Sequence, residues 1–216
     1  MPIPEAGEYG YKKERKFMES DKLLLLFVRN PELGKVKTRI AKELGDEKAL
    51  EIYKKLLHHT RTITKEVDAD RLVYYHEKIG EDDLWDEPVY AKKVQPEGDL
   101  GYKMMYAFSN AFKESYQRVI IIGSDCLELN QEIIEQAFAA LEHKDVVIGP
   151  AKDGGYYLLG MKALYKTLFE NKAWSTSSVF QATLHNIRQE GLTYALLPEL
   201  SDVDKAADVD PALLLL

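Results

Sequence analysis

The stretch KLLLLFVRNPELGKVKTRI, residues 22–40, decides the fold. Its first part, Lys22–Val28, is a continuous apolar run, which is typical of a strand buried on both faces of a parallel sheet. A loop follows over residues 29–34, and the segment that continues through Ile40–Leu44 predicts a helix. A buried strand that passes through a short loop into a helix is the first half of a strand–helix–strand unit.

The same alternation continues along the chain. Gly45 is predicted to stop the first helix, and Asp46 to cap the second. Further strands are predicted at 71–76, 89–94, 119–122, 145–149, 155–161 and 193–197, and further helices at 104–112, 131–142 and 174–190. This pattern predicts an α/β protein with a mostly parallel sheet.

The composition is that of an acidic globular protein. Hydrophobic residues make up 45% of the 216 residues and charged residues 30%, and the formal net charge is −7. This charge argues against a protein that coats nucleic acid, so phosphates can bind only at a local basic site. The single cysteine, Cys126, cannot form an internal disulfide, which fits a reducing compartment.

We expect one domain over residues 21–216, preceded by a loose, charged arm over residues 1–20 that has no apolar period. The apolar run Leu23–Val28 is too short to span a membrane. It also lacks the cleavage pattern of a signal peptide. We therefore predict a cytoplasmic protein with no membrane span.

Three cations follow the first predicted strand. Lys35, Lys37 and Arg39 come directly after Gly34. In an open α/β sheet, ligands bind beyond the carboxyl ends of the strands, where a glycine lets the backbone approach a phosphate and a helix N-terminus favours anions. The segment predicts a polyphosphate site, although it lacks Walker A spacing. A solvated basic helix start explains the spacing equally well.

Two acidic motifs are candidates for a metal site. Asp125 ends a Gly-Ser-Asp motif after a buried strand, where a carboxylate can hold Mg²⁺ or Mn²⁺ together with substrate phosphates. In the Asp-Val-Asp motif of residues 202–204, alternation places both carboxylates on one face. Helix capping alone would also explain Asp125, and an acidic surface turn explains Asp202 better than Asp204.

Two glycine segments are candidates for ligand contacts. In the loop Gln95–Lys103, Gly101 can bring the backbone near a base or phosphate, and Lys103 adds a cation. The second segment has two glycines beside an aspartate that can bond sugar hydroxyls, and an aromatic motif follows it; its candidates are Asp153, Gly154, Gly155, Tyr156, Trp174 and Ser175. A β-turn and a buried aromatic before a helix cap explain this second segment without any ligand.

No other catalytic arrangement stands out. The five histidines have no zinc-ligand spacing, and no Ser-His-Asp or Cys-His set is evident. Cys126 is interpreted as a small buried residue rather than a nucleophile.

Taken in order, six motifs resemble one family. They are NPELGKVKTRI, QPEGDLGYKM, VIIIGSDCLEL, IGPAKDGGYYLLGM, WSTSSVF and LPELSDVDKAADV, and they extend from about Leu23 to Asp208. The sequence resembles the DUF2064 group of glycosyltransferase-A-like proteins, which is similar to the phospholactate guanylyltransferases of coenzyme F420 synthesis. Two positions depart from the usual motifs: Leu127 replaces a proline, and Lys205-Ala206 replaces Thr-Pro.

The resemblance implies a nucleotide-diphospho-sugar transferase (GT-A) fold, which is a Rossmann-like three-layer α/β/α architecture. It implies phosphate roles for Lys35, Lys37 and Arg39, and a metal on Asp125 with Asp204 as second ligand. It also implies that Asp153, Gly154, Gly155 and Trp174 line the acceptor side.

The predicted function is metal-dependent transfer from a nucleoside triphosphate or nucleotide-sugar to a small-molecule acceptor. The basic loop favours nucleotidyl transfer, because a pyrophosphate leaving group benefits from clustered cations. The fold and the usual labelling of the family favour glycosyl transfer instead. The motif departures leave a third hypothesis, a nucleotide-binding module without catalysis. A homodimer is an open expectation for an α/β enzyme of this size.

Overall fold

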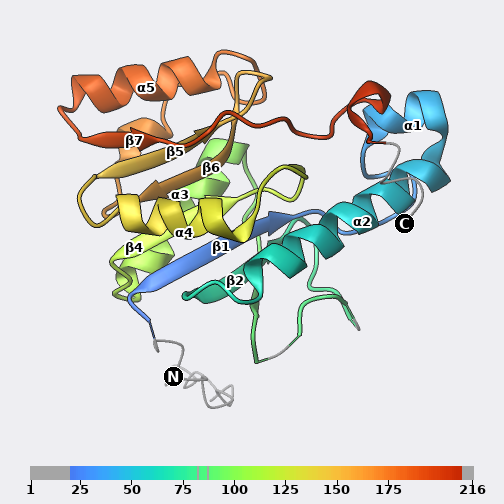
Figure 1. Cartoon of the computed structure of the whole chain (residues 1–216), viewed down its shortest axis with the longest axis horizontal. Coiled ribbons are helices and arrows are strands. Elements are labelled where there is room, and N and C mark those ends of the chain that lie inside the picture. The colour runs from blue at the N-terminus through green and yellow to red at the C-terminus, as the bar shows by residue number, and fades with distance from the viewer. Residues whose placement is uncertain (1–19, 82, 87, 211–216) are drawn as a thin grey trace, which may run out of the picture.

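The computed structural model describes residues 20–81, 83–86 and 88–210, which are built around one seven-stranded sheet (Figure 1). The strands are β1 Lys22–Val28, β2 Asp70–Tyr75, β3 Ala91–Val94, β4 Arg118–Ile122, β5 Val146–Pro150, β6 Tyr156–Met161 and β7 Tyr194–Leu196. The helices are α1 Thr38–Leu44, α2 Asp46–Thr64, α3 Leu100–Lys113, α4 Gln131–Ala140 and α5 Val179–Gln189, with short 3-10 helices at Lys166–Leu168 and Ala206–Asp208. The arm expected over residues 1–20 lies outside the described residues, except for Ser20.

The sheet confirms the predicted α/β class. Its strand order is β3-β2-β1-β4-β6-β5-β7. β1 is parallel to β2 and β4, β2 to β3, and β5 to β7. β6 is antiparallel to both β4 and β5. The turn between β5 and β6 is too short for a crossover, and a short turn can join only antiparallel neighbours.

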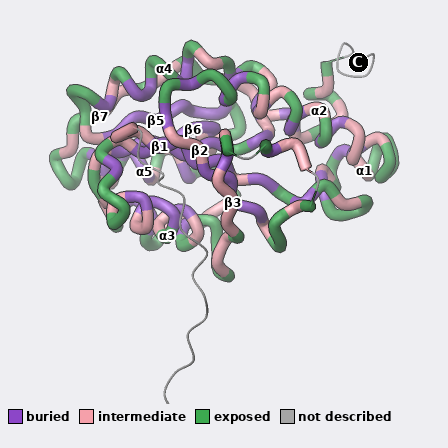
Figure 2. The backbone as a smooth tube through the Cα atoms, turned by 90° about the horizontal axis from the view of Figure 1, so that it is seen from below, coloured by how far each residue is buried: buried purple, intermediate pink, exposed green. Residues whose placement is uncertain are grey.

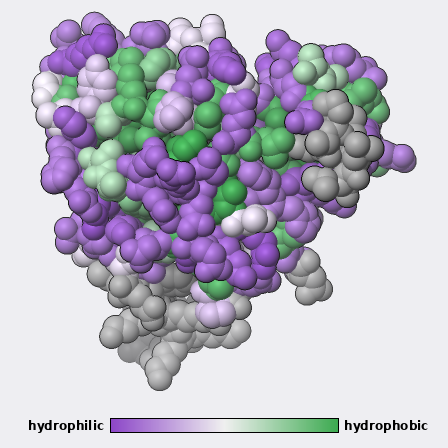
Figure 3. Space-filling view, viewed as in Figure 1, coloured by the Kyte–Doolittle hydropathy of each residue, from purple (hydrophilic) through white to green (hydrophobic). Residues whose placement is uncertain are grey.

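β1 lies at the centre because its residues are buried on both faces. Leu24 and Leu26 pack with α2 and α4 on one face, whereas Leu23 and Leu25 pack with α3 and α5 on the other. Figure 2 shows the two helix layers on opposite sides of the sheet. The apolar run therefore has no polar face, as expected of a central parallel strand. The outside of the molecule is largely hydrophilic on the face seen in Figure 3.

Two predicted helix starts are corrected by the backbone. Gly45 ends α1 with φ 84° but is also the N-cap of α2, so Asp46 is the first helical residue rather than the cap. The positive end of the α2 dipole still stabilises the Asp46 carboxylate. α5 begins at Val179, not at 174, because Ser175 has φ 63° and Thr176 Oγ1 donates to the Ala173 carbonyl at 2.7 Å.

The segment after β7 crosses the molecule to reach α1 (Figure 1, red). Leu200 forms an isolated parallel bridge with Ala151. Val203 is then buried in a small apolar cluster with Ile40 and Ile52. The last described part of the chain is thereby held beside the loop that follows β1. No helix in the described ranges has the length and apolar character needed to cross a bilayer.

Alanine substitution at two glycines tests the turn before β6. Gly154 has φ 89°, and a Cβ there would lie 2.1 Å from the Ser177 carbonyl oxygen, whereas Gly191 has φ 65° and no atom within 4 Å of such a Cβ. Gly191→Ala should cost about 1 kcal/mol of left-handed backbone strain. Gly154→Ala should cost a further 1–3 kcal/mol or so, because the Ser177 backbone must move. Urea unfolding measures both, and equal losses would contradict this packing.

Candidate functional site

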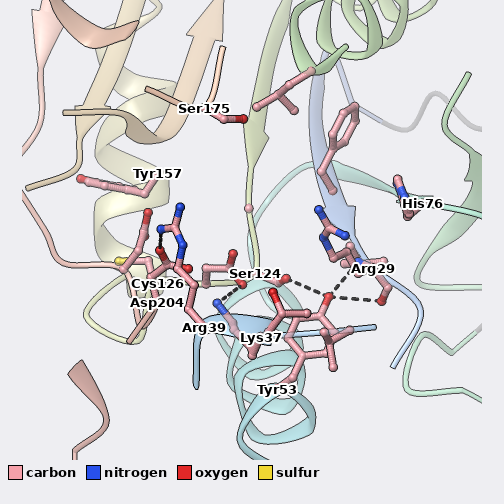
Figure 4. Close-up of a pocket in the computed structure, with 18 of the residues that line it drawn as sticks. Arg29, Lys37, Arg39, Tyr53, His76, Ser124, Cys126, Tyr157, Ser175 and Asp204 are labelled. Carbon is pink, nitrogen blue, oxygen red and sulfur yellow. Dashed lines mark hydrogen bonds and ion pairs between the residues drawn. The ribbon is translucent and has the colours of Figure 1, made fainter. Parts of the chain in front are cut away.

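A cavity of about 590 Å³ opens at the carboxyl ends of β1, β2 and β4 (Figure 4). This is where an open α/β sheet binds ligands. Its walls come from the strand ends, the loop before α1, the start of α3 and the tail after β7. The lining residues are Phe27, Val28, Arg29, Lys35, Val36, Lys37, Thr38, Arg39, Tyr53, His76, Gln95, Leu100, Lys103, Gly123, Ser124, Asp125, Cys126, Tyr156, Tyr157, Ser175, Asp202 and Asp204.

Lys37 joins three segments of the chain at this cavity. Its side chain is only 5% exposed, and its Nζ lies 2.8 Å from Asp125 Oδ1 at the end of β4. The same ammonium donates to the Val203 carbonyl in the tail at 2.7 Å. Val203 N also donates to the Asp125 carbonyl at 2.8 Å. A single buried cation therefore connects the β1 loop, the β4 loop and the tail.

Arg39 pairs with Asp204 at the same end of the cavity. Both side chains are about half exposed, so ligands can reach them. The turn that presents Asp204 is closed by Asp208, whose carboxylate accepts from Asp204 N at 3.1 Å and Lys205 N at 2.8 Å. The chain thus forms this turn although Lys205 and Ala206 stand where the family motif usually has Thr-Pro.

Lys35 lies at the rim of the cavity and is compensated by two carboxylates. Its Nζ is 2.7 Å from Glu32 and 3.2 Å from Glu77. Hydrogen bonding to these two groups raises the pKa of Lys35. The three cations predicted for phosphate binding all line the cavity, and each of them has a carboxylate partner in this structure.

Asp202 belongs to the cavity as much as Asp204 does. Burial, together with the negative charges of Asp125 and Asp153, raises the pKa of Asp202 to about 7. From sequence, an acidic surface turn explained Asp202 better than Asp204. The alternation of the Asp-Val-Asp motif already placed both carboxylates on one face, and the structure directs that face into the cavity.

The carboxylates that line the cavity fit a hard divalent cation that shares its ligands with phosphates. Asp125, Asp202 and Asp204 provide oxygen donors and crowd negative charge around Asp202. Among the residues that the structure describes, no three metal-ligating side chains are grouped closely enough to hold an ion. Mg²⁺ commonly binds through one or two carboxylates with substrate phosphates and waters, and this donor set suits that mode rather than a protein cage.

The remaining predicted site residues divide into two sets. Lys103, Tyr156 and Ser175 line the cavity. The lining does not include Gly34, Gly101, Asp153, Gly154, Gly155 and Trp174. In this structure Gly101, Gly154 and Trp174 take part in close packing, whereas Gly34 and Asp153 shape turns.

Gly101 shows how such a residue serves packing. It is buried in α3, and a Cβ there would lie 2.3 Å from the Trp174 indole. Trp174 thus packs directly on the helix backbone. Asp153 shapes a turn, because its Oδ1 accepts from Gly155 N at 2.8 Å. Gly34 has φ 74°, a backbone conformation that suits glycine in the turn before α1.

Tyr53, from α2, is a supporting residue of the site. Its hydroxyl accepts from Arg29 N at 2.7 Å and lies 3.3 Å from Ser124 Oγ, which ties the ends of β1 and β4 together. Burial raises the pKa of Tyr53 to about 12, so the hydroxyl stays protonated. Arg29, His76 and Gln95 also line the cavity and were not predicted. The only sequence signal for them is their position directly after a strand.

The fold and the site together define an α/β protein of the nucleotide-diphospho-sugar transferase type. The sequence pattern of the DUF2064 family, described as uncharacterized proteins conserved in bacteria, matches residues 59–176. The chain belongs to this family. A crystal structure from Desulfovibrio desulfuricans G20, assigned to the nucleotide-diphospho-sugar transferases, is 34% identical with a TM-score of 0.79. The match covers 86% of this chain and 83% of that chain.

More distant structures share the fold alone. One is the 4-diphosphocytidyl-2C-methyl-D-erythritol synthase from Anaerococcus prevotii DSM 20548, at 10% identity and TM-score 0.52, covering 90% of this chain and 93% of the other. Another is CMP:2-keto-3-deoxy-manno-octonic acid synthetase in complex with CTP, at 9% identity and TM-score 0.50, covering 91% and 98%. No curated protein matches the sequence.

A double-mutant cycle tests the Lys37–Asp125 pair. Asp125→Asn should cost about 1–3 kcal/mol of unfolding free energy, because it leaves a buried ammonium without its carboxylate; the half-exposed Asp125 keeps the loss below that of a fully buried pair. Lys37→Met with Asp125→Asn should cost less than the sum of the single losses.

The Lys22–Asp68 pair is the matched control, because its atoms are 2.7 Å apart but Asp68 is 89% exposed. Its coupling energy should be near zero, since surface pairs contribute little. Urea unfolding of the wild type and of the single and double variants of both pairs gives both coupling energies. Similar values for the two pairs would show that Lys37 is not held by Asp125.

Proposed function

We propose that this protein is a metal-dependent transferase that acts on a nucleotide-activated substrate. The observation that carries the proposal is the convergence of Lys37 and Arg39 with Asp125, Asp202 and Asp204 in one cavity. Cations that contact carboxylates at the carboxyl end of a parallel sheet suit a ligand that brings both phosphates and a divalent cation. The fold shared with the 34% identical structure supports the same class.

The cationic and the acidic residues of the cavity have different proposed roles. Lys37, Arg39 and Lys35 would neutralise phosphate oxygens, with Arg39 suited to bidentate contact. Asp125 and Asp204, with Asp202 beside them, would hold Mg²⁺ or Mn²⁺ at the phosphates. The cation, when bound, supplies Lewis-acid stabilisation of the charge that develops on the leaving group. Binding would exchange the present Lys37–Asp125 and Arg39–Asp204 contacts for contacts with ligand.

Nucleotidyl transfer is the reaction that we favour. An anionic oxygen of the acceptor forms a bond to the α-phosphorus, the bond from that phosphorus to the bridging oxygen breaks, and pyrophosphate leaves with the electron pair. Because the attacking oxygen is already deprotonated, no general base is required. Clustered cations stabilise the charge on the departing pyrophosphate. Glycosyl transfer is the second candidate, and the assignment of the 34% identical structure favours it.

A thermal-shift screen tests the class and the reaction together. The purified chain is scanned with each nucleoside triphosphate and common nucleotide-sugars, with and without Mg²⁺ or Mn²⁺. A ligand that binds only the native state stabilises it by about 2.7 kcal/mol at 100 times its Kd. We expect a metal-dependent rise in Tm with one triphosphate, followed by pyrophosphate release when acceptors are added. A rise confined to a nucleotide-sugar would replace nucleotidyl with glycosyl transfer.

Asp204→Asn tests the metal role. It should abolish the metal-dependent part of the nucleotide shift, because a neutral amide binds a hard cation weakly. Asp68→Asn, outside the cavity, is the control and should keep the full shift. A wild-type protein that shows no shift with any nucleotide would contradict the proposal. Nucleotide binding without product would indicate the binding module.

A further inference from the structure

The cavity has two ends of different character. Figure 4 shows Lys37, Arg39 and Asp204 toward one side, and Arg29 and His76 toward the other. Lys103, from the first turn of α3, lies at the second end, with its Nζ 3.4 Å from His76 Nδ1. The proposed transferase function assigns no role to Arg29, His76 or Lys103.

The two ends differ in how their cations are compensated. Lys35, Lys37 and Arg39 each have a carboxylate within 4.0 Å. Within the part of the chain that the structure describes, Arg29 and Lys103 also line the cavity but have no carboxylate partner. In a protein of net charge −7, two such cations in one recess create a local field that attracts anions.

His76 lies within the field of both cations. Burial lowers the pKa of His76, and the positive charges of Lys103 and Arg29 lower it further. A neutral imidazole that accepts from Lys103 through Nδ1 carries its proton on Nε2 and is a hydrogen-bond donor. The Gln95 side chain also hydrogen-bonds His76 and, with the charge of Glu77, acts against the lowering of its pKa. The side chain of Arg29 is exposed at the end of β1, while its backbone is fixed by the Tyr53 hydroxyl.

We propose that Arg29, His76 and Lys103 form an anion subsite that binds a phosphate-monoester group of the second substrate. Two cations and a neutral donor match a phosphoryl dianion better than a carboxylate, and the guanidinium fork suits its oxygens. The proposal rests on the transferase function above, which places the phosphates of the nucleotide at the Lys37 end. The second substrate is therefore a phosphorylated small molecule.

Calorimetric titration with inorganic phosphate tests the subsite on the full chain, without nucleotide or metal. Arg29→Met and Lys103→Met keep the apolar stems and remove the charges. Each should weaken phosphate binding about tenfold or more, as expected for the loss of one charge-assisted hydrogen bond. Lys113→Met on the same helix removes one charge outside the cavity lining and should change the affinity by less than about twofold.

Absence of phosphate binding to the wild-type chain, or unchanged affinity in both cavity variants, would overturn the proposal. So would loss of phosphate binding in Arg39→Met alone, which would place the anion at the other end. Saturating nucleotide with Mg²⁺ should leave phosphate binding in place, and competition would assign the subsite to the nucleotide instead. Because the first titration needs no nucleotide, its failure is distinct from failure of the transferase function.

Discussion

The site depends on one buried ammonium group. Lys37 is almost fully enclosed, and a buried cation is tolerated only where charged and polar partners surround it. Its partners are Asp125 at the end of β4 and the Val203 carbonyl in the tail. The backbone at Lys37 is left-handed, with φ 47°, a conformation that non-glycine residues adopt at some cost. The contacts of the side chain offset that cost and hold Asp125 and the tail with Asp202 and Asp204 at the cavity.

The sheet is the apolar frame that holds the Lys37–Asp125 contact at its carboxyl edge. β1 pairs with β2 on one side and β4 on the other, so their carboxyl ends present Arg29, His76 and Ser124 along one edge. The Tyr53 hydroxyl fixes the distance between two of these ends from the α2 side. The frame is apolar and the edge is charged, so ligands meet the edge of the sheet, where Lys37 and Asp125 also contribute to stability.

Much of the frame could be predicted from sequence because it depends on local patterns. Continuous apolar runs located the strands, and the rule for carboxyl ends placed Lys37 and Asp125 at the same edge. β6 was located but not oriented, although the shortness of the turn before it held that information. The place of Gly101 against the Trp174 indole could not be predicted, because a glycine beside a ligand and a glycine beneath an indole look the same in sequence.

The partners of the charges could not be predicted, because they are far apart in the chain. Arg39 and Asp204 are 165 residues apart, and the spacing of the basic loop does not show that its cations are compensated. Asp202 and Arg29 were undervalued for the same reason. Their character comes from what surrounds them in space: burial and other carboxylates for Asp202, and, within the described ranges, no carboxylate partner for Arg29.

The crossing of the tail has a consequence for synthesis of the chain. A ribosome makes protein from the N-terminus, so β1 and the basic loop emerge long before residues 202–204. Strands β1 to β6 can pair while the nascent chain still lacks the Val203 carbonyl and the Asp204 carboxylate. Asp202 and Asp204 are therefore made after every other residue that lines the cavity, and long after the basic loop that they face.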